Sequence, residues 1–216
     1  MFPPRWFLPY DAAFQLITAL VALAVALYAL RGYRWVRERT LYALFLAFLL
    51  LSVGLFVNGI TLSYASFTGV TFSKMGSSSM VADIGFWAYY IMSILAYSLL
   101  LFAYVDRLRE SSIALAAGGM MGKGGAGESL VAAGPILELA LVILLFIVLI
   151  VQLAHLTVRR NRYSVLVTAS FTLLLLSHLL MMFSSLEDLI YVAGRMLELG
   201  GFISLLLVLV GLRRAG

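Results

Sequence analysis

The sequence has no cysteine and few charged residues, and both shortages limit what kind of protein it can be. Without cysteine the chain can form no disulfide bond and no thiolate metal site, and it has no cysteine nucleophile. Only 12% of its residues are charged, whereas 63% are hydrophobic, well above the roughly 45 to 50% that is usual in soluble domains. The composition therefore predicts a protein that resides in a lipid bilayer.

Motifs of known catalytic sites are also missing. The sequence has no HExxH zinc-protease motif, no G-x-S-x-G nucleophile elbow and no phosphate-binding loop. Its formal charge of +5 comes from short basic clusters beside apolar runs, which is typical of anchoring at a membrane surface and not of nucleic-acid binding. We expect no enzymatic activity, no nucleic-acid partner, and no metal or other cofactor.

Long apolar runs are the main feature that is present. Each reaches about 20 residues, which as an α-helix crosses roughly 30 Å of hydrocarbon. Because the runs are continuous and lack period-two alternation, they favour helices over a β-barrel. The sequence predicts an all-α, multi-pass integral protein of the cell membrane, with six transmembrane helices at 10–31, 40–63, 84–105, 135–156, 164–184 and 189–210.

The two halves of the chain resemble each other. The stretch "RRNRYSVLVTASFTLLLLSHLL" at 159–180 aligns with "RWVRERTLYALFLAFLLLSVGL" at 34–55, which places Ser177 on Ser52. We interpret the halves as two repeats of three helices each, with chance similarity between leucine-rich helices as the alternative. The chain then divides into a first repeat at 1–110, a Gly-rich segment at 111–134 and a second repeat at 135–216.

The Gly-rich segment decides the topology. With six crossings the basic residues divide evenly between the two sides of the membrane, whereas a seventh crossing at 111–134 places most of them on one side. Its glycines, Lys123 and Glu128 make it a poor lipid-facing helix, so a cytoplasmic loop between inverted repeats stays open. We favour an irregular seventh crossing and parallel repeats, with the N-terminus outside and the C-terminus inside the cell.

Four polar residues of the last span form a candidate site. Asp188, Tyr191, Arg195 and Glu198 follow one another at spacings that place all four on one helical face. An arginine that faces lipid costs at least about 2.5 kcal/mol, so this seam is expected to face the bundle interior. Two interpretations stay open: a ligand-binding pocket within the membrane, or an internal ion pair that fixes the rotation of the helix.

Other polar residues extend this candidate site. His178 lies at a depth similar to that of Arg195 and is a candidate proton-sensitive group or metal or haem ligand, although a hydrogen bond to a nearby serine or a backbone carbonyl is the favoured interpretation. Glu138 and Asn58 add polar groups toward the outer half of the membrane. If these residues converge with the seam, they form a site that opens outward.

Residues near the ends of the spans are given simpler roles. The acidic residues Asp11, Asp83 and Asp188 are interpreted as hydrated helix caps. Aromatic residues are interpreted as anchors at the membrane interfaces, namely Trp6, Phe7, Tyr10, Tyr33, Trp35, Trp87, Tyr89 and Tyr90.

Three stretches carry a resemblance to known proteins. "ALRGYRWVRERTLYALFLAFLLLSVGLFVNG", "RRNRYSVLVTASFTLLLLSHLL" and "RMLELGGFISLLLVLVGLRR" resemble a group of uncharacterised archaeal polytopic membrane proteins and, more distantly, seven-span membrane sensor modules. The resemblance implies membrane residence and supplies no reaction. In that group the place of Arg195 often looks like a histidine, so a histidine-based metal site is not carried over to this chain.

Three functions remain after these considerations. The first is a non-enzymatic sensory or partner-binding module, such as an accessory subunit, which acts with a partner protein or as a homo-oligomer in the lipid bilayer. The alternative is a small transporter with a polar site between pseudo-symmetric halves. The third, a b-type haem protein, would have to draw both iron ligands from His155 and His178.

Overall fold

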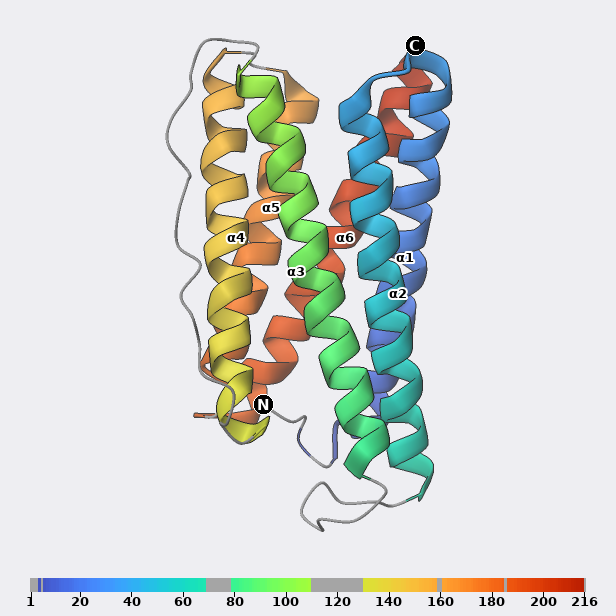
Figure 1. Cartoon of the computed structure of the whole chain (residues 1–216), viewed down its shortest axis with the longest axis vertical. Helices are drawn as coiled ribbons and strands as arrows, with labels where there is room; N and C mark the ends of the chain where they lie inside the picture. Colours follow the sequence, from blue (N-terminus) through green and yellow to red (C-terminus); the bar gives the residue numbers. More distant parts are fainter. Residues whose placement is uncertain are drawn as a thin grey trace.

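The structure is a computed structural model and describes residues 4, 6–68, 79–109, 130–158, 161–184 and 186–215. These residues form six α-helices (Figure 1): α1 (Leu8–Val36), α2 (Arg39–Thr68), α3 (Ser79–Arg109), α4 (Leu130–Val158), α5 (Arg162–Met182) and α6 (Asp188–Ala215).

The predictions of an all-α fold and of six membrane spans are confirmed. The shortest helix, α5, has 21 residues and the longest, α3, has 31, so each is at least about 30 Å long at 1.5 Å per residue. Every helix in the described part of the chain is apolar enough to cross a membrane. The chain is therefore a polytopic membrane protein.

The helices form a closed ring in chain order. Each helix contacts the next one, and α6 returns to contact α1. Between α1 and α2 the chain turns sharply, because Arg37 adopts a left-handed φ of 55° and its N–H bonds to the carbonyl of Tyr33. Only Arg37 and Glu38 separate the two helices, which makes them antiparallel neighbours.

The two triplets of helices, α1 to α3 and α4 to α6, run through the bundle in the same order of directions. Figure 1 shows that α1, α3, α4 and α6 run one way and that α2 and α5 run the opposite way. As a result α3 and α4 are parallel neighbours, and so are α6 and α1. Most of the predicted crossing at 111–134 lies outside the described residues, so the crossing and the sequence repeat stay predictions.

Aromatic side chains fill the middle of the ring. Phe48 of α2 meets Phe202 of α6 at a centroid distance of 6.0 Å, and Tyr104 of α3 meets Phe171 of α5 at 6.2 Å. Neither pair of helices is adjacent in the ring. Because Phe48, Phe171 and Phe202 are at most 1% exposed, the ring encloses a packed core in this region.

Glycine allows α5 and α6 to approach closely. A Cβ atom on Gly201 would lie 2.9 Å from a side-chain carbon of Leu174 and 3.2 Å from the carbonyl oxygen of Ser170. One residue earlier, Gly200 has no heavy atom within 4 Å of the equivalent position. Close packing of small residues is a main source of helix association in membranes, so Gly201 sets the spacing of this helix pair.

We expect Gly201→Ala to destabilise the protein by about 1 to 3 kcal/mol, because the methyl group overpacks the interface. The matched change Gly200→Ala is expected to be neutral or stabilising by up to about 1 kcal/mol, since alanine is the better helix former. Unfolding of the purified variants by sodium dodecyl sulfate, followed by circular dichroism, measures both. Equal effects of the two substitutions would contradict the close approach at Gly201.

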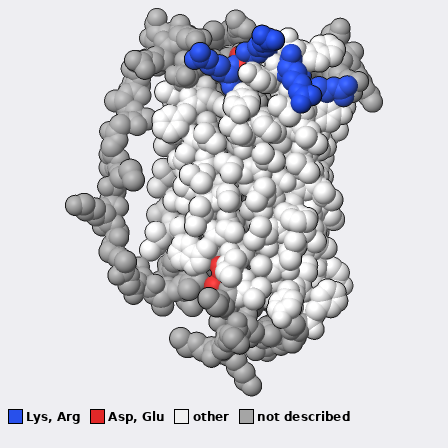
Figure 2. Space-filling model, turned by 45° about the vertical axis from the view of Figure 1, so that its right-hand side comes forward, with Lys and Arg blue, Asp and Glu red and all other residues white. Residues whose placement is uncertain are grey.

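The balance of charge differs between the two ends of the bundle, although the end rich in arginine also carries Glu38. Among the described side chains, Figure 2 shows Lys and Arg gathered at one end, the end at which α1 turns into α2. At the opposite end the described charged side chains are acidic: Asp83, Glu187 and Asp188. Because cytoplasmic segments carry the excess of lysine and arginine, we call the basic end the inner end and the acidic end the outer end. The exposed residues that mark the inner end are Arg31, Arg34, Arg37, Arg39 and Arg162.

This orientation can be tested with single cysteines, since the natural chain has none. Trp35 at the inner end is 83% exposed and Leu186 at the outer end is 77% exposed. We expect a membrane-impermeant maleimide to label Leu186→Cys in intact cells and Trp35→Cys only after the membrane is permeabilised. The reverse pattern would show that the bundle is inserted the other way up.

Candidate functional site

A cluster of buried polar side chains joins α1, α2, α3 and α6 in the outer half of the bundle. Its centre is Arg195, which lies in the third turn of α6 and is only 6% exposed. We call it the Arg195 cluster, and it consists of Asp11, Gln15, Asn58, Tyr89, Tyr191, Arg195 and Glu198.

The guanidinium of Arg195 is held by two carboxylates. Its Nε lies 3.0 Å from Oδ1 of Asp11 on α1, and its Nη1 donates a 2.7 Å hydrogen bond to Oε2 of Glu198. Nε and Nη2 also lie 3.2 Å from the hydroxyl of Tyr191. The rings of Tyr191 and Tyr89 lie 5.4 and 5.7 Å from the guanidinium carbon, within the range of a cation–π contact.

Amide and hydroxyl groups complete the cluster around these charges. Gln15 donates a 3.0 Å bond to Oδ2 of Asp11, and Asn58 on α2 donates a 2.6 Å bond to the amide oxygen of Gln15. Tyr191 donates to Asp11 at 2.8 Å. Because Asp11 and Gln15 are four residues apart on one helix, both side chains reach the same site. The cluster thus ties α6 to α1 and, through Gln15, to α2.

A second polar cluster joins α3, α4 and α5. The hydroxyl of Tyr90 donates a 2.7 Å bond to Oε1 of Glu138, and Nδ1 of His178 lies 2.8 Å from Oε2 of the same carboxyl. Nε2 of His178 lies 3.4 Å from the hydroxyl of Tyr97. We call Tyr90, Tyr97, Glu138 and His178 the Glu138 cluster, and all four side chains are buried.

The two clusters meet on α3 and bridge both interfaces between the triplets. Tyr89 belongs to the first cluster and Tyr90 to the second, and their rings are 5.1 Å apart. The contact of Asp11 with Arg195 crosses from α1 to α6, and the bond of Tyr90 to Glu138 crosses from α3 to α4. At each interface, therefore, an acidic residue from the first helix of one triplet is bonded to the last helix of the other.

Negative charge exceeds positive charge in this buried region. The two clusters contain three carboxyl groups, one guanidinium and one imidazole, and each of these five side chains is at most 6% exposed. Even with a proton on His178, ionisation of all three carboxyls would leave one negative charge uncompensated. An isolated charge in a low-dielectric interior is costly, so such a group is expected to neutralise by binding a proton.

The structure brings together most, but not all, of the predicted site residues. Tyr191, Arg195 and Glu198 face the interior and contact one another, so the internal ion pair is present. Asp188 does not join them: it is exposed at the first residue of α6, where a carboxylate is stabilised by the free N–H groups of the helix. Whether the predicted residues bind a ligand stays a prediction, and those at the two clusters are Asn58, Glu138, His178, Tyr191, Arg195 and Glu198.

Two of the simpler interpretations were wrong. Asp11 is not a hydrated cap, since it is fully buried against Arg195. Phe7, Tyr89 and Tyr90 are not interface anchors, because each is at most 4% exposed. The signal that was missed is Gln15, four residues after Asp11 in an otherwise apolar run, which marks an inward-facing polar stripe.

His178 also differs from expectation. Among the described residues its partners are Glu138 and Tyr97 on other helices and not a serine of its own helix, because the imidazole points away from α5 toward α4 and α3. Ser177 bonds instead to the carbonyl of Leu174. His155 lies near the inner end of α4, about 24 Å from the depth of His178 by helical rise, so the two histidines do not fit one haem iron.

Comparison with protein-family models, with curated proteins and with solved structures gives no match for this chain. The resemblance to archaeal polytopic proteins and sensor modules therefore stays a prediction, and the function has to be argued from the site.

We expect Arg195→Gln to destabilise the protein by about 3 to 5 kcal/mol, because it leaves Asp11 and Glu198 as buried carboxylates without a counter-charge. The second change Asp11→Asn should recover part of this loss in the double variant. Detergent unfolding curves measure both effects. Arg31→Gln, at the exposed inner end, is the control and should stay within about 0.5 kcal/mol of the natural chain; an equal loss there would argue against a special role of Arg195.

Proposed function

We propose that this chain is a non-enzymatic sensory or partner-binding membrane module in which the two helix triplets shift relative to each other. The responsive element is the pair of buried clusters, and the signal reaches it from the outer side. The observation that supports the proposal is that a buried acidic side chain bridges each of the two interfaces between the triplets.

Physical reasoning favours the interfaces between triplets as the place of change. Within each triplet, helices next in sequence are antiparallel neighbours joined directly in the ring. Between triplets the bridging groups are ionisable, and a local change of charge is a common way to bias a packing arrangement. A shift there would reach the basic inner end, where a partner protein or a second copy of this chain would receive it.

A small transporter is the second candidate function. It is favoured by the position of the polar clusters between two triplets that run in the same direction, since substrate sites of many transporters lie between repeats. The packed core favours the sensory module over the transporter. Between these clusters and the inner end, Phe48, Phe171 and Phe202 fill the ring, and the bonds described for the Glu138 cluster end at Tyr97.

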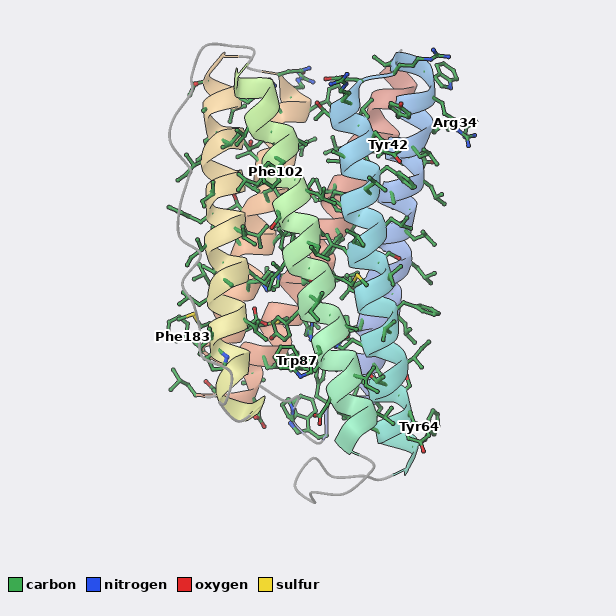
Figure 3. The ribbon with its side chains drawn as sticks, viewed as in Figure 1. Arg34, Tyr42, Tyr64, Trp87, Phe102 and Phe183 are labelled. Carbon is green, nitrogen blue, oxygen red and sulfur yellow. The ribbon has the colours of Figure 1, made fainter. Side chains whose placement is uncertain are left out.

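We expect Asp11→Asn combined with Arg195→Gln to change distances between the triplets and not within one. Tyr42 on α2, Phe102 on α3 and Val165 on α5 are exposed side chains of the bundle, and Figure 3 labels the first two. Spin labels on Tyr42→Cys and Val165→Cys measure the distance between triplets. We expect it to shift or broaden by several ångströms, because the fixed bridge from α1 to α6 is lost.

The pair Tyr42→Cys and Phe102→Cys lies within one triplet and serves as the control. A change of the same size in both pairs would mean that the triplets do not move as units.

To separate sensing from transport, proteoliposomes loaded with a pH-sensitive dye are exposed to a pH jump. Proton flux above that of protein-free liposomes would reject the sensory module in favour of the transporter.

A further inference from the structure

The Glu138 cluster has no permanent positive charge, and this distinguishes it from the Arg195 cluster. In the Arg195 cluster a guanidinium, which stays protonated in proteins, lies between two carboxylates. The described partners of Glu138 are the hydroxyl of Tyr90 and the imidazole of His178. Among the described residues, therefore, only a proton shared by Glu138 and His178 neutralises this carboxyl locally.

Hydrogen bonding in the cluster is compatible with both proton occupancies. In both, Nδ1–H of His178 donates to Glu138 across 2.8 Å, while Nε2 faces the hydroxyl of Tyr97 across 3.4 Å. When His178 is neutral, the Tyr97 hydroxyl donates to Nε2. When a proton from water binds Nε2, the hydroxyl rotates and its oxygen accepts the new N–H. The two states differ by one charge and leave no ring nitrogen without a partner.

The surrounding charges are of both signs. Helices α4 and α6 pack against α5, and α3 contributes a ring contact. Burial and the charge of Arg195 oppose a proton on His178, whereas the carboxylates of Glu138 on α4 and Glu198 on α6 favour it. Because these influences oppose each other, no single one of them decides whether His178 binds a proton. The groups that face His178 from the neighbouring helices, or lie farther off in the joined clusters, are Glu138, Tyr90, Tyr97, Glu198, Arg195 and Asp11.

We propose that Glu138 and His178 form a proton-binding site that controls the interface between α3 and α4. This rests on the proposed function, because it names the proton as the signal that the module receives. Loss of the proton leaves the Glu138 carboxylate without a counter-charge in a low-dielectric interior, which favours an arrangement of α3 and α4 in which water reaches this carboxylate. The guanidinium of Arg195 keeps its charge and its contact with Asp11, so the interface between α1 and α6 acts as the pivot.

The proton site can be observed directly because the chain has only two histidines. The probe is the ¹⁵N-histidine NMR spectrum of the full chain in lipid nanodiscs, and His155→Gln leaves the imidazole of His178 as the single signal. We expect this signal to change from the protonated to the Nδ1–H neutral form as the pH is raised through the range in which histidines titrate. An imidazole that keeps one form throughout this range would overturn the proposal without the need for any further variant.

Two substitutions identify the partners of the proton. Glu138→Gln removes the anion and should lower the proton affinity of His178 at least tenfold. Tyr97→Phe removes the rotating hydroxyl and should lower the affinity by a smaller factor, because the protonated Nε2–H then lacks an acceptor. A proton affinity unchanged in Glu138→Gln would overturn the assignment of the site to this pair.

Spin-label distances link the proton to the interface. We expect the distance between Phe102→Cys on α3 and Ile150→Cys on α4 to follow the titration of His178. The distance between Leu27→Cys on α1 and Leu207→Cys on α6 is expected to stay constant. All four natural side chains are exposed. Titration of His178 with no change in either distance would retain the proton site but reject its control of the interface. No titration, together with a shift between triplets in the Asp11→Asn and Arg195→Gln variant, would reject the proton site and leave the proposed function standing.

Discussion

A buried arginine that must be paired inside the membrane fixes much of this structure. Because Arg195 cannot face lipid without a cost of at least about 2.5 kcal/mol, α6 is rotated so that the guanidinium meets Asp11 and Glu198. Asp11 in turn fixes the rotation of α1 and, through Gln15, the contact of α1 with α2. Hydrophobic burial gives little orientation in lipid, since the solvent is itself apolar. These few polar contacts, with the close approach at Gly201, therefore determine how the helices are rotated and which of them pair.

The fold was predictable from the sequence to a greater extent than the site. Apolar length alone predicts the six helices, because a span has to satisfy its own backbone. The helical spacing of Tyr191, Arg195 and Glu198 predicts one inward polar face. It does not predict which other helix supplies the partner, since that depends on the order of helices in the ring. Asp11 illustrates the difficulty: its place near the start of a span is typical of a hydrated cap, and only its contact with α6 shows that it is a counter-ion.

Asymmetry between the two clusters connects the architecture to the proposed function. The helices of the two triplets follow the same order of directions, and both interfaces between the triplets carry an acidic bridge. The bridges differ in chemistry, because one pairs with a guanidinium whose charge is constant and the other with a phenol and an imidazole. With two bridges of constant charge, the triplets could not move relative to each other. With two titratable bridges, neither interface would serve as a fixed axis for that movement. One bridge of each kind permits rotation about a single interface.

In the proposed function, such a rotation would reach the inner end mechanically and not through ionic contacts. The bonds described for the Glu138 cluster end at Tyr97, and farther along the bundle the ring is filled by Phe48, Phe171 and Phe202. Side chains packed at crystalline density transmit displacement, because they have no room to absorb it. Phe48 and Phe202 also belong to different triplets and meet edge to face. A shift between the triplets in the outer half must therefore move this contact, and with it the arginine-bearing turns at the inner end.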